Sequence, residues 1–245
     1  DVKSGVVTSS LAGGNDLVWS RDSSKIIVSE SRPGEGKIGK IQVWDVATSK
    51  ALFSLSNMKI SIHYGLEIAP DGKILASTAS RGRVFLWNLA QQRIIRAIPA
   101  DEQSVRYMTL SPDGKKLATC GSERIVKIWS LETGKPLFGL QKHDSESEVY
   151  RVDFSPDGTK LVSAWSDGYL GVWELTKGKN VARFRGPTWQ VRWMKDSKTL
   201  AAANKSGVYF YNAANAVRKA SYRPMPNGMG VLISAGGHYS GPTGV

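Results

Sequence analysis

The chain has 245 residues, is 41% hydrophobic and carries a formal net charge of +12, from 33 lysines and arginines against 21 aspartates and glutamates. A chain of this length buries a substantial core without cross-links, and its one cysteine excludes an intramolecular disulfide framework and a cysteine-based zinc site. No apolar stretch approaches the roughly 20 residues of a membrane-spanning helix, so the sequence predicts no membrane partner.

Two short markers recur in step along the chain. The first is a turn of the form Ser-Pro-Asp-Gly, or a variant of it, and its copies begin at Ser20, Ala69, Ser111, Ser155 and Met194. The second is an aromatic residue that closes an apolar run; the copies are Trp44, Trp87, Trp129, Trp173 and Tyr211, spaced by 43, 42, 44 and 38 residues. Because both markers keep the same order, we interpret them as one repeated structural unit.

Each repeat predicts four short strands, named a to d in chain order. Short alternating or wholly apolar runs lie on both sides of each Asp-Gly turn, as in Val152–Phe154 and Leu161–Ala164. Such runs favour antiparallel strands joined by tight turns, and the apolar spacing of a helix is absent. The predicted repeats in chain order are 15–55, 60–97, 103–140, 147–185 and 188–221.

This pattern resembles the WD40 family, whose repeat of about 40–45 residues ends strand c with Trp-Asp. The resemblance covers roughly Leu17 to Ala220, and the turn usage is similar to that of bacterial WD40 repeats. It implies an all-β propeller of four-stranded antiparallel blades. The closing dipeptides, from a full match to graded departures, are Trp44-Asp45, Trp87-Asn88, Trp129-Ser130, Trp173-Glu174 and Tyr211-Asn212.

Two family features are weak in this sequence. No Gly-His dipeptide precedes any strand a, and only Asp167 matches the buried aspartate that the family places before strand c. We therefore expect the family's His–Ser–Asp–Trp hydrogen-bond network to be mostly missing. Cohesion between blades should then depend on the apolar residues that stand just before the turns: Trp19, Leu110, Phe154 and Trp193.

The two ends of the chain predict a sixth blade. Residues 228–245 align with the first strands of a repeat, and residues 1–12 resemble an outer strand without its own blade. Joining them would protect an open sheet edge. We expect one domain over 1–245 with five full blades and a sixth from both ends; alternatively, the sequence is part of a larger ring in a larger protein.

Catalytic chemistry has little support in the sequence. The three histidines are far apart without metal-ligand spacing, and the carboxylates of the turns are explained by local capping. The G-x-G-x-x-G pattern at 34–39 is followed by an apolar strand instead of the helix that a dinucleotide site requires. We predict no catalytic residue, metal or cofactor, and an enzyme with its site in the central channel is a remote alternative.

The start of strand a is the first candidate interaction surface, because these positions surround the channel mouth in a propeller. Tyrosine, tryptophan and arginine are enriched at binding hot spots, and the resemblance implies a partner protein or an adjacent domain. The alternative is that these side chains only wedge between blades. The predicted partner-binding residues are Tyr64, Arg106, Tyr107, Tyr150, Arg151 and Trp189.

A basic rim on the opposite face is the second candidate. Lysines of this rim could bind nucleic acid or another polyanion in a salt-dependent way. An aspartate in every such turn cancels much of the positive field of these lysines, so a protein scaffold is the favoured function. The favoured compartment is the cytoplasm. The lysines of this alternative are Lys25, Lys73, Lys115, Lys116, Lys160 and Lys198.

Overall fold

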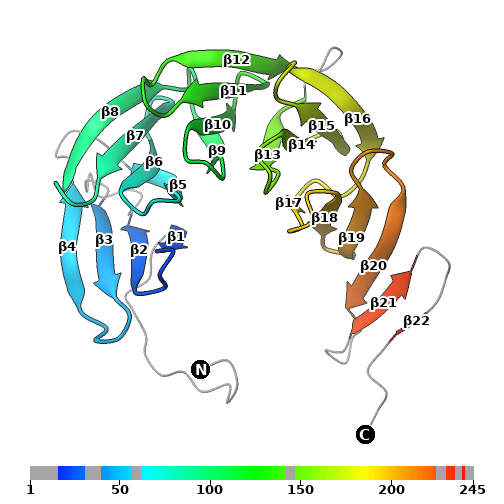
Figure 1. The fold of residues 1–245 in the computed structure, drawn as a ribbon, viewed down its shortest axis with the longest axis horizontal. Helices are drawn as coiled ribbons and strands as arrows, with labels where there is room; N and C mark the ends of the chain where they lie inside the picture. Colours follow the sequence, from blue (N-terminus) through cyan, green and yellow to red (C-terminus); the bar gives the residue numbers. More distant parts are fainter. Residues whose placement is uncertain are drawn as a thin grey trace, which may run out of the picture. The chain divides into compact units, whose positions relative to one another are not determined.

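The computed structural model describes residues 16–30, 40–56, 62–141, 147–224, 230–234 and 239–240. All regular secondary structure in these ranges is β-strand, and the strands form five antiparallel sheets (Figure 1). This confirms the predicted fold class of four-stranded antiparallel blades. Among the described residues there is no helix with the length and hydropathy needed to cross a membrane.

Contacts along the chain divide it into two compact units, Asp1–Val105 and Arg106–Val245. The first unit holds two four-stranded meanders. The strands of its first sheet are β1 (Asp16–Trp19), β2 (Lys25–Glu30), β3 (Lys40–Asp45) and β4 (Ala51–Ser56). Those of its second sheet are β5 (Ile62–Ile68), β6 (Ile74–Ala79), β7 (Arg83–Asn88) and β8 (Arg93–Pro99).

The second unit holds three sheets, and the boundary between the units falls within β9. The third sheet contains β9 (Val105–Leu110), β10 (Lys116–Gly121), β11 (Ile125–Ser130) and β12 (Pro136–Gln141). The fourth contains β13 (Val149–Phe154), β14 (Lys160–Trp165), β15 (Tyr169–Glu174) and β16 (Lys179–Arg185). The fifth contains β17 (Gln190–Trp193), β18 (Thr199–Asn204), β19 (Gly207–Asn212), β20 (Arg218–Pro224), β21 (Gly230–Ser234) and β22 (Tyr239–Ser240).

The recurring Ser-Pro-Asp-Gly marker is a hydrogen-bonded turn between the first two strands of a sheet. The Ser111 hydroxyl donates to Asp113 at 2.5 Å and accepts the Lys116 N–H at 2.9 Å. Gly114 supplies the positive φ of 68° that closes the turn. The turns at Ser20 and Ser155 repeat these bonds, so the marker identifies one local structure.

Three of the four apolar residues that were predicted to support cohesion between blades are buried, and one is not. Phe154 and Trp193 are buried in the second unit, as predicted, and so is Leu110. Trp19 is 48% exposed, so the prediction was wrong for it. Its neighbour Val18 packs into the core of the first unit, and alternate strand residues point to opposite faces. Trp19 therefore lies on the face of the first sheet that does not contact the second.

The family's hydrogen-bond network was predicted to be mostly missing. This prediction needs correction for the bonds between tryptophan and serine or threonine. In three sheets the closing tryptophan donates from Nε1 to a buried hydroxyl on the neighbouring strand. The acceptor stands two residues beyond the strand partner of the tryptophan, so this pattern follows from register. The pairs are Trp87–Ser77 at 2.9 Å, Trp129–Thr119 at 2.9 Å and Trp173–Ser163 at 2.8 Å.

The first sheet lacks this acceptor. Trp44 pairs with Ile26, so the acceptor position is the buried Val28, and Trp44 Nε1 is buried without a hydrogen-bond partner among the described residues. Val28→Thr is expected to raise the free energy of unfolding by about 1 kcal/mol, because a threonine hydroxyl can accept this N–H. Urea denaturation of the purified protein measures the change.

Val43→Thr is the matched control, because Val43 is equally buried in the same sheet but stands outside the acceptor position. Its new hydroxyl should lower the free energy of unfolding by about 1–2 kcal/mol. Equal destabilisation by both substitutions would contradict the proposed role of position 28.

The sixth blade stays a prediction. Residues 1–15 lie outside the described ranges. Strands β21 and β22 continue the fifth sheet, because β21 pairs antiparallel with β20 and β22 pairs with β21. The G-x-G-x-x-G segment at 34–39 also lies outside the described residues.

Candidate functional site

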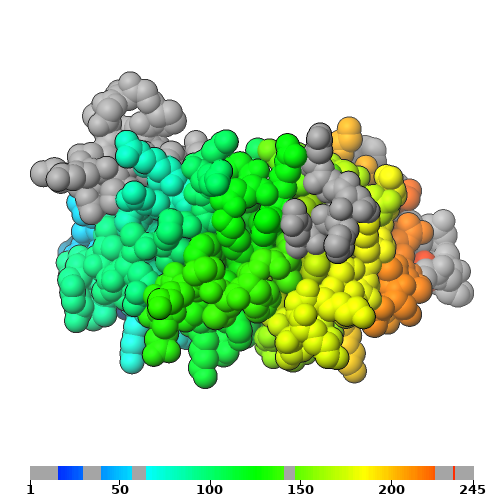
Figure 2. Space-filling view, turned by 90° about the horizontal axis from the view of Figure 1, so that it is seen from above, coloured from blue at the N-terminus to red at the C-terminus, as the bar shows by residue number. Residues whose placement is uncertain are grey.

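The first strands of the three sheets in the second unit lie next to one another at the inner side of that unit. Strands β9, β13 and β17 occupy this side, and β12 and β16 lie outermost (Figure 1). Viewed from the outer side, the third and fourth sheets form a packed surface, green and yellow in Figure 2. Side chains of the inner strands alternate between the cores and the opposite face: Val152 and Val191 are buried, whereas Arg192 is exposed.

An arginine–tyrosine cluster connects these three strands; we define it as Arg106, Tyr107, Tyr150, Arg151 and Arg192. At its centre, the guanidinium of Arg151 lies 4.6 Å from the centroid of the Tyr107 ring, and that of Arg192 lies 5.7 Å away. Arg192 also donates from Nη2 to the Tyr107 hydroxyl at 2.5 Å. Cations over an aromatic ring are attracted by its quadrupole, so Tyr107 of β9 is held by β13 and β17 together.

Asp153 fixes the position of Arg192. Its carboxylate lies 3.1 Å from Arg192 Nη1 and accepts the backbone N–H of Trp193 at 2.8 Å. Burial raises the pKa of Asp153, and the Trp193 N–H and the Arg192 guanidinium offset only part of that shift. The Trp193 indole also donates to the Asp153 carbonyl. These bonds tie β17 to β13 at the base of the cluster.

Solvent reaches the edge of the cluster as well as Arg192 at its centre, whose side chain is 51% exposed. Arg106 forms a 2.8 Å ion pair with Glu148, and its guanidinium lies 5.9 Å from the Tyr150 ring centroid. Arg151 donates from Nη1 to the Tyr150 carbonyl at 2.9 Å. The Arg106 and Glu148 side chains are 43% and 35% exposed, so solvent and a partner can reach them.

The structure brings together four of the six predicted partner-binding residues, namely Arg106, Tyr107, Tyr150 and Arg151. Trp189 stands immediately before β17, and its side chain is 59% exposed. Tyr64 lies in β5 of the first unit, and its side chain is outside the described residues. The cluster both connects neighbouring strands and is exposed to solvent. Side chains that pack between sheets can therefore also form a binding surface.

Sequence reasoning missed Arg192, Asp153, Glu148 and Gln190. Gln190 accepts a hydrogen bond from Arg151 Nε at 3.3 Å. The missed signal was the alternation of strands: Arg151 and Asp153 share one face of β13, and Gln190 and Arg192 share one face of β17. The predicted residues all stand at the start of their strands, whereas Asp153 and Arg192 stand further along them.

Most lysines of the predicted basic rim stand in turns with an aspartate whose pKa is lowered. Hydrogen bonds from the Thr199 hydroxyl and from backbone N–H groups lower the pKa of Asp196 to about 2. The Ser20 hydroxyl likewise lowers the pKa of Asp22. Lys73, Lys115 and Lys198 are exposed, and Lys25, Lys116 and Lys160 are half-buried. Nucleic-acid or polyanion binding stays a prediction, with a field of mixed sign.

Two further observations concern metal-ligating side chains and the cysteine. Over the described ranges, no group of three or more histidine, cysteine, aspartate or glutamate side chains is arranged to hold a metal ion. Cys120 is buried in the core between the third and fourth sheets. The side chains of the three histidines lie outside the described part of the chain.

The fold and the cluster define a repeat protein of four-stranded antiparallel sheets whose inner strands carry arginine and tyrosine. Two family models match it: "WD domain, G-beta repeat" over residues 134–174 and "Anaphase-promoting complex subunit 4 WD40 domain" over residues 66–146. In a comparison with curated protein sequences, none matches significantly. These two matches together span residues 66–174 and identify WD40 repeats in that part of the chain. WD40 repeats generally mediate protein–protein interaction or scaffolding, and their families are generally non-enzymatic.

Proposed function

We propose that this protein is a non-enzymatic scaffold that binds a protein partner, or a neighbouring domain, through the arginine–tyrosine cluster and Trp189. One observation carries the proposal: the guanidiniums of Arg151 and Arg192 hold the Tyr107 ring. The exposed Trp189 stands just before β17, the strand that contributes Arg192. Arginine, tyrosine and tryptophan contribute most to binding free energy at protein interfaces.

Rigid presentation supports this function. A partner that binds loose side chains must overcome their conformational entropy, at about 0.5–1.5 kcal/mol for each immobilised side chain. Arg151 and Arg192 are already fixed by Gln190, Tyr150 and Asp153. The cluster is therefore ordered before a partner arrives.

The charge of the cluster indicates the chemistry of the partner. Three arginines face two carboxylates, Glu148 and Asp153, which leaves a formal charge of +1 by counting. The Asp153 carboxylate is engaged by Arg192 and the Trp193 N–H. A partner segment with one or two carboxylates and an apolar or aromatic residue for Trp189 would complement this surface.

The test is a double substitution, Tyr150→Ala with Trp189→Ala. A partner captured from the native source by the wild-type protein is purified, and its affinity is measured by isothermal titration calorimetry. Loss of two hot-spot aromatics is expected to weaken binding by about 100-fold or more. Both side chains are partly exposed, so the free energy of unfolding should change little.

Tyr222→Ala with Leu137→Ala is the matched control, since these side chains are exposed on β20 and β12, away from the inner strands. This variant should keep the wild-type affinity. The scaffold proposal fails if the Tyr150 and Trp189 variant binds as tightly as the wild type. Binding to nucleic-acid probes that falls steeply with salt and ignores both double variants would instead favour the basic rim.

A further inference from the structure

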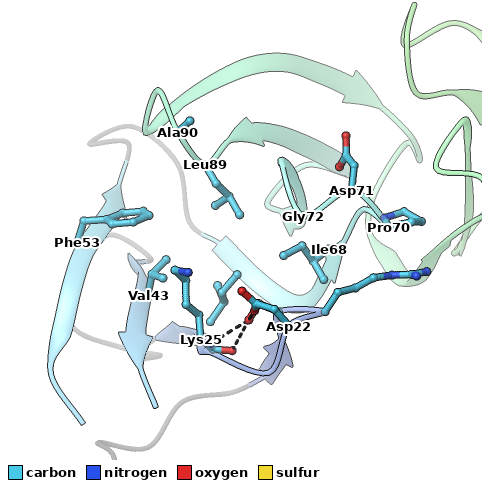
Figure 3. Close-up of a pocket in the computed structure, with 13 residues that line it drawn as sticks. Asp22, Lys25, Val43, Phe53, Ile68, Pro70, Asp71, Gly72, Leu89 and Ala90 are labelled. Atoms are coloured by element: carbon cyan, nitrogen blue, oxygen red, sulfur yellow. Dashed lines mark hydrogen bonds between the residues drawn. The ribbon is translucent and has the colours of Figure 1, made fainter. Parts of the chain in front are cut away.

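A cavity of about 400 Å³ lies between the two sheets of the first unit. Its apolar wall is formed by Ile27, Val43 and Phe53 from the first sheet and by Ile68 and Leu89 from the second. Figure 3 shows Phe53 and Val43 on one side of the cavity, with Ile68 and Leu89 opposite. The cavity opens at the end of the sheets where the Ser-Pro-Asp-Gly turns and their variants lie.

The repeats show why space is left at this junction. The residue just before the turn is Phe154 in the fourth sheet and Trp193 in the fifth, and each ring is buried against the preceding sheet. The equivalent residue of the second sheet is Ile68, which is only half-buried. Because isoleucine is smaller than phenylalanine or tryptophan, the second sheet leaves unfilled the volume that a ring occupies at the two junctions of the second unit.

The facing positions strengthen this comparison. Nine residues after the closing aromatic, the preceding sheet contributes Phe138 to the core that contains Phe154, and Ala182 to the core that contains Trp193. At the first junction the same positions hold Phe53 and Ile68. In the two junctions of the second unit, the later sheet supplies a ring just before the turn. At this junction that residue is Ile68, and the rings that the second sheet supplies to the core, Phe85 and Trp87, do not line the cavity.

The mouth of the cavity carries balanced charge. Arg21 and Lys25 supply two cations, and Asp22 and Asp71 supply two carboxylates. Asp22 accepts hydrogen bonds from the Ser20 hydroxyl and the Ser24 N–H, and Asp71 accepts the Lys73 N–H. An uncharged group suits such a mouth, and a nearby guanidinium favours an aromatic face.

We propose that this cavity is a socket for one aromatic side chain of a peptide partner. Its volume lies in the lower part of the range typical of ligand pockets, which suits a single anchoring residue better than a cofactor. The chain's own Phe154 and Trp193 show which chemical group fills this place between two sheets. This site lies in the first unit and does not depend on the arginine–tyrosine cluster.

The probe for this site is N-acetyl-L-tryptophanamide, titrated into the full-length ¹⁵N-labelled protein. Amide chemical shifts of the lining residues Gly72, Leu89 and Ala90 are expected to change in a saturable way, and N-acetyl-L-alaninamide should leave them unchanged. Ile68→Trp places the chain's own indole in the cavity, so it should weaken binding of the probe at least tenfold while the Tm stays equal or rises.

Ile95→Trp is the matched control, because it makes the same change at an exposed position of β8 that does not line the cavity. It should bind the probe as the wild type does. If Ile68→Trp does not fold, Ile68→Phe repeats the test with a smaller ring. Unchanged binding by the folded Ile68 variant, or no saturable shifts in the wild type, would overturn the proposal. Binding of free indole without binding of the tryptophanamide would also overturn it, because the socket would then exclude a peptide backbone.

Discussion

Ser163→Ala is expected to lower the free energy of unfolding by about 2–5 kcal/mol, more than removal of any other single hydroxyl in the described sheets. The Ser163 hydroxyl is fully buried and accepts two indole N–H groups, from Trp165 and Trp173, each at 2.8 Å. A buried donor that loses its acceptor costs about 1–3 kcal/mol, and alanine removes the acceptor of both indole bonds.

Ser77→Ala is the comparison, because the Ser77 hydroxyl is equally buried and accepts a single indole N–H, from Trp87. Its expected cost is about half that of Ser163→Ala. Urea denaturation monitored by circular dichroism measures both values. Equal costs for the two substitutions would show that the second indole of the fourth sheet does not depend on Ser163.

Gly82→Ala is expected to destabilise the first unit by more than about 3 kcal/mol or to prevent its folding. Gly82 has a φ of 63°, and a Cβ there would stand 1.9 Å from the Asp101 carbonyl oxygen. The Gly82 carbonyl also accepts the N–H groups of Ala100 and Asp101. Relief of the overlap would therefore break the two bonds that hold the chain after β8, in addition to the strain of a positive φ.

Gly72→Ala separates these two effects. Gly72 has a nearly identical φ of 69°, but no atom lies within 4 Å of its Cβ position. We expect a cost of about 1 kcal/mol from backbone conformation alone. Thermal unfolding of both variants compares them, and a similar loss for Gly72 and Gly82 would contradict the steric explanation.

The arginine–tyrosine cluster shows how far sequence reasoning reached. The repeat predicted four of its residues, Arg106, Tyr107, Tyr150 and Arg151, because they stand at equivalent positions of successive first strands. Its pairing was not found: Tyr107 and Arg192 are 85 residues apart, and Asp153 and Arg192 are 39 apart. No local pattern links residues at such separations, since only the packing of sheets brings them together.

The hydrogen bonds of tryptophan show a related limit. No Gly-His dipeptide precedes any strand a, and only Asp167 matches the family's buried aspartate. These absences predicted that the network was mostly missing. Ser77, Thr119 and Ser163 nevertheless accept the indole N–H groups. The register between neighbouring strands determines these pairs, and the structure supplies that register.

The sequence by itself determined the number of strands in each repeat, the positions of the turns and the all-β class. These features depend on residues close in the chain: Asp-Gly turns, alternating apolar residues and a recurring aromatic. Only the tertiary structure decided which charges meet on the inner strands, which tryptophan lacks an acceptor and where a cavity remains. Those outcomes depend on the volumes and polar groups of side chains from different sheets, and these meet only when the sheets pack.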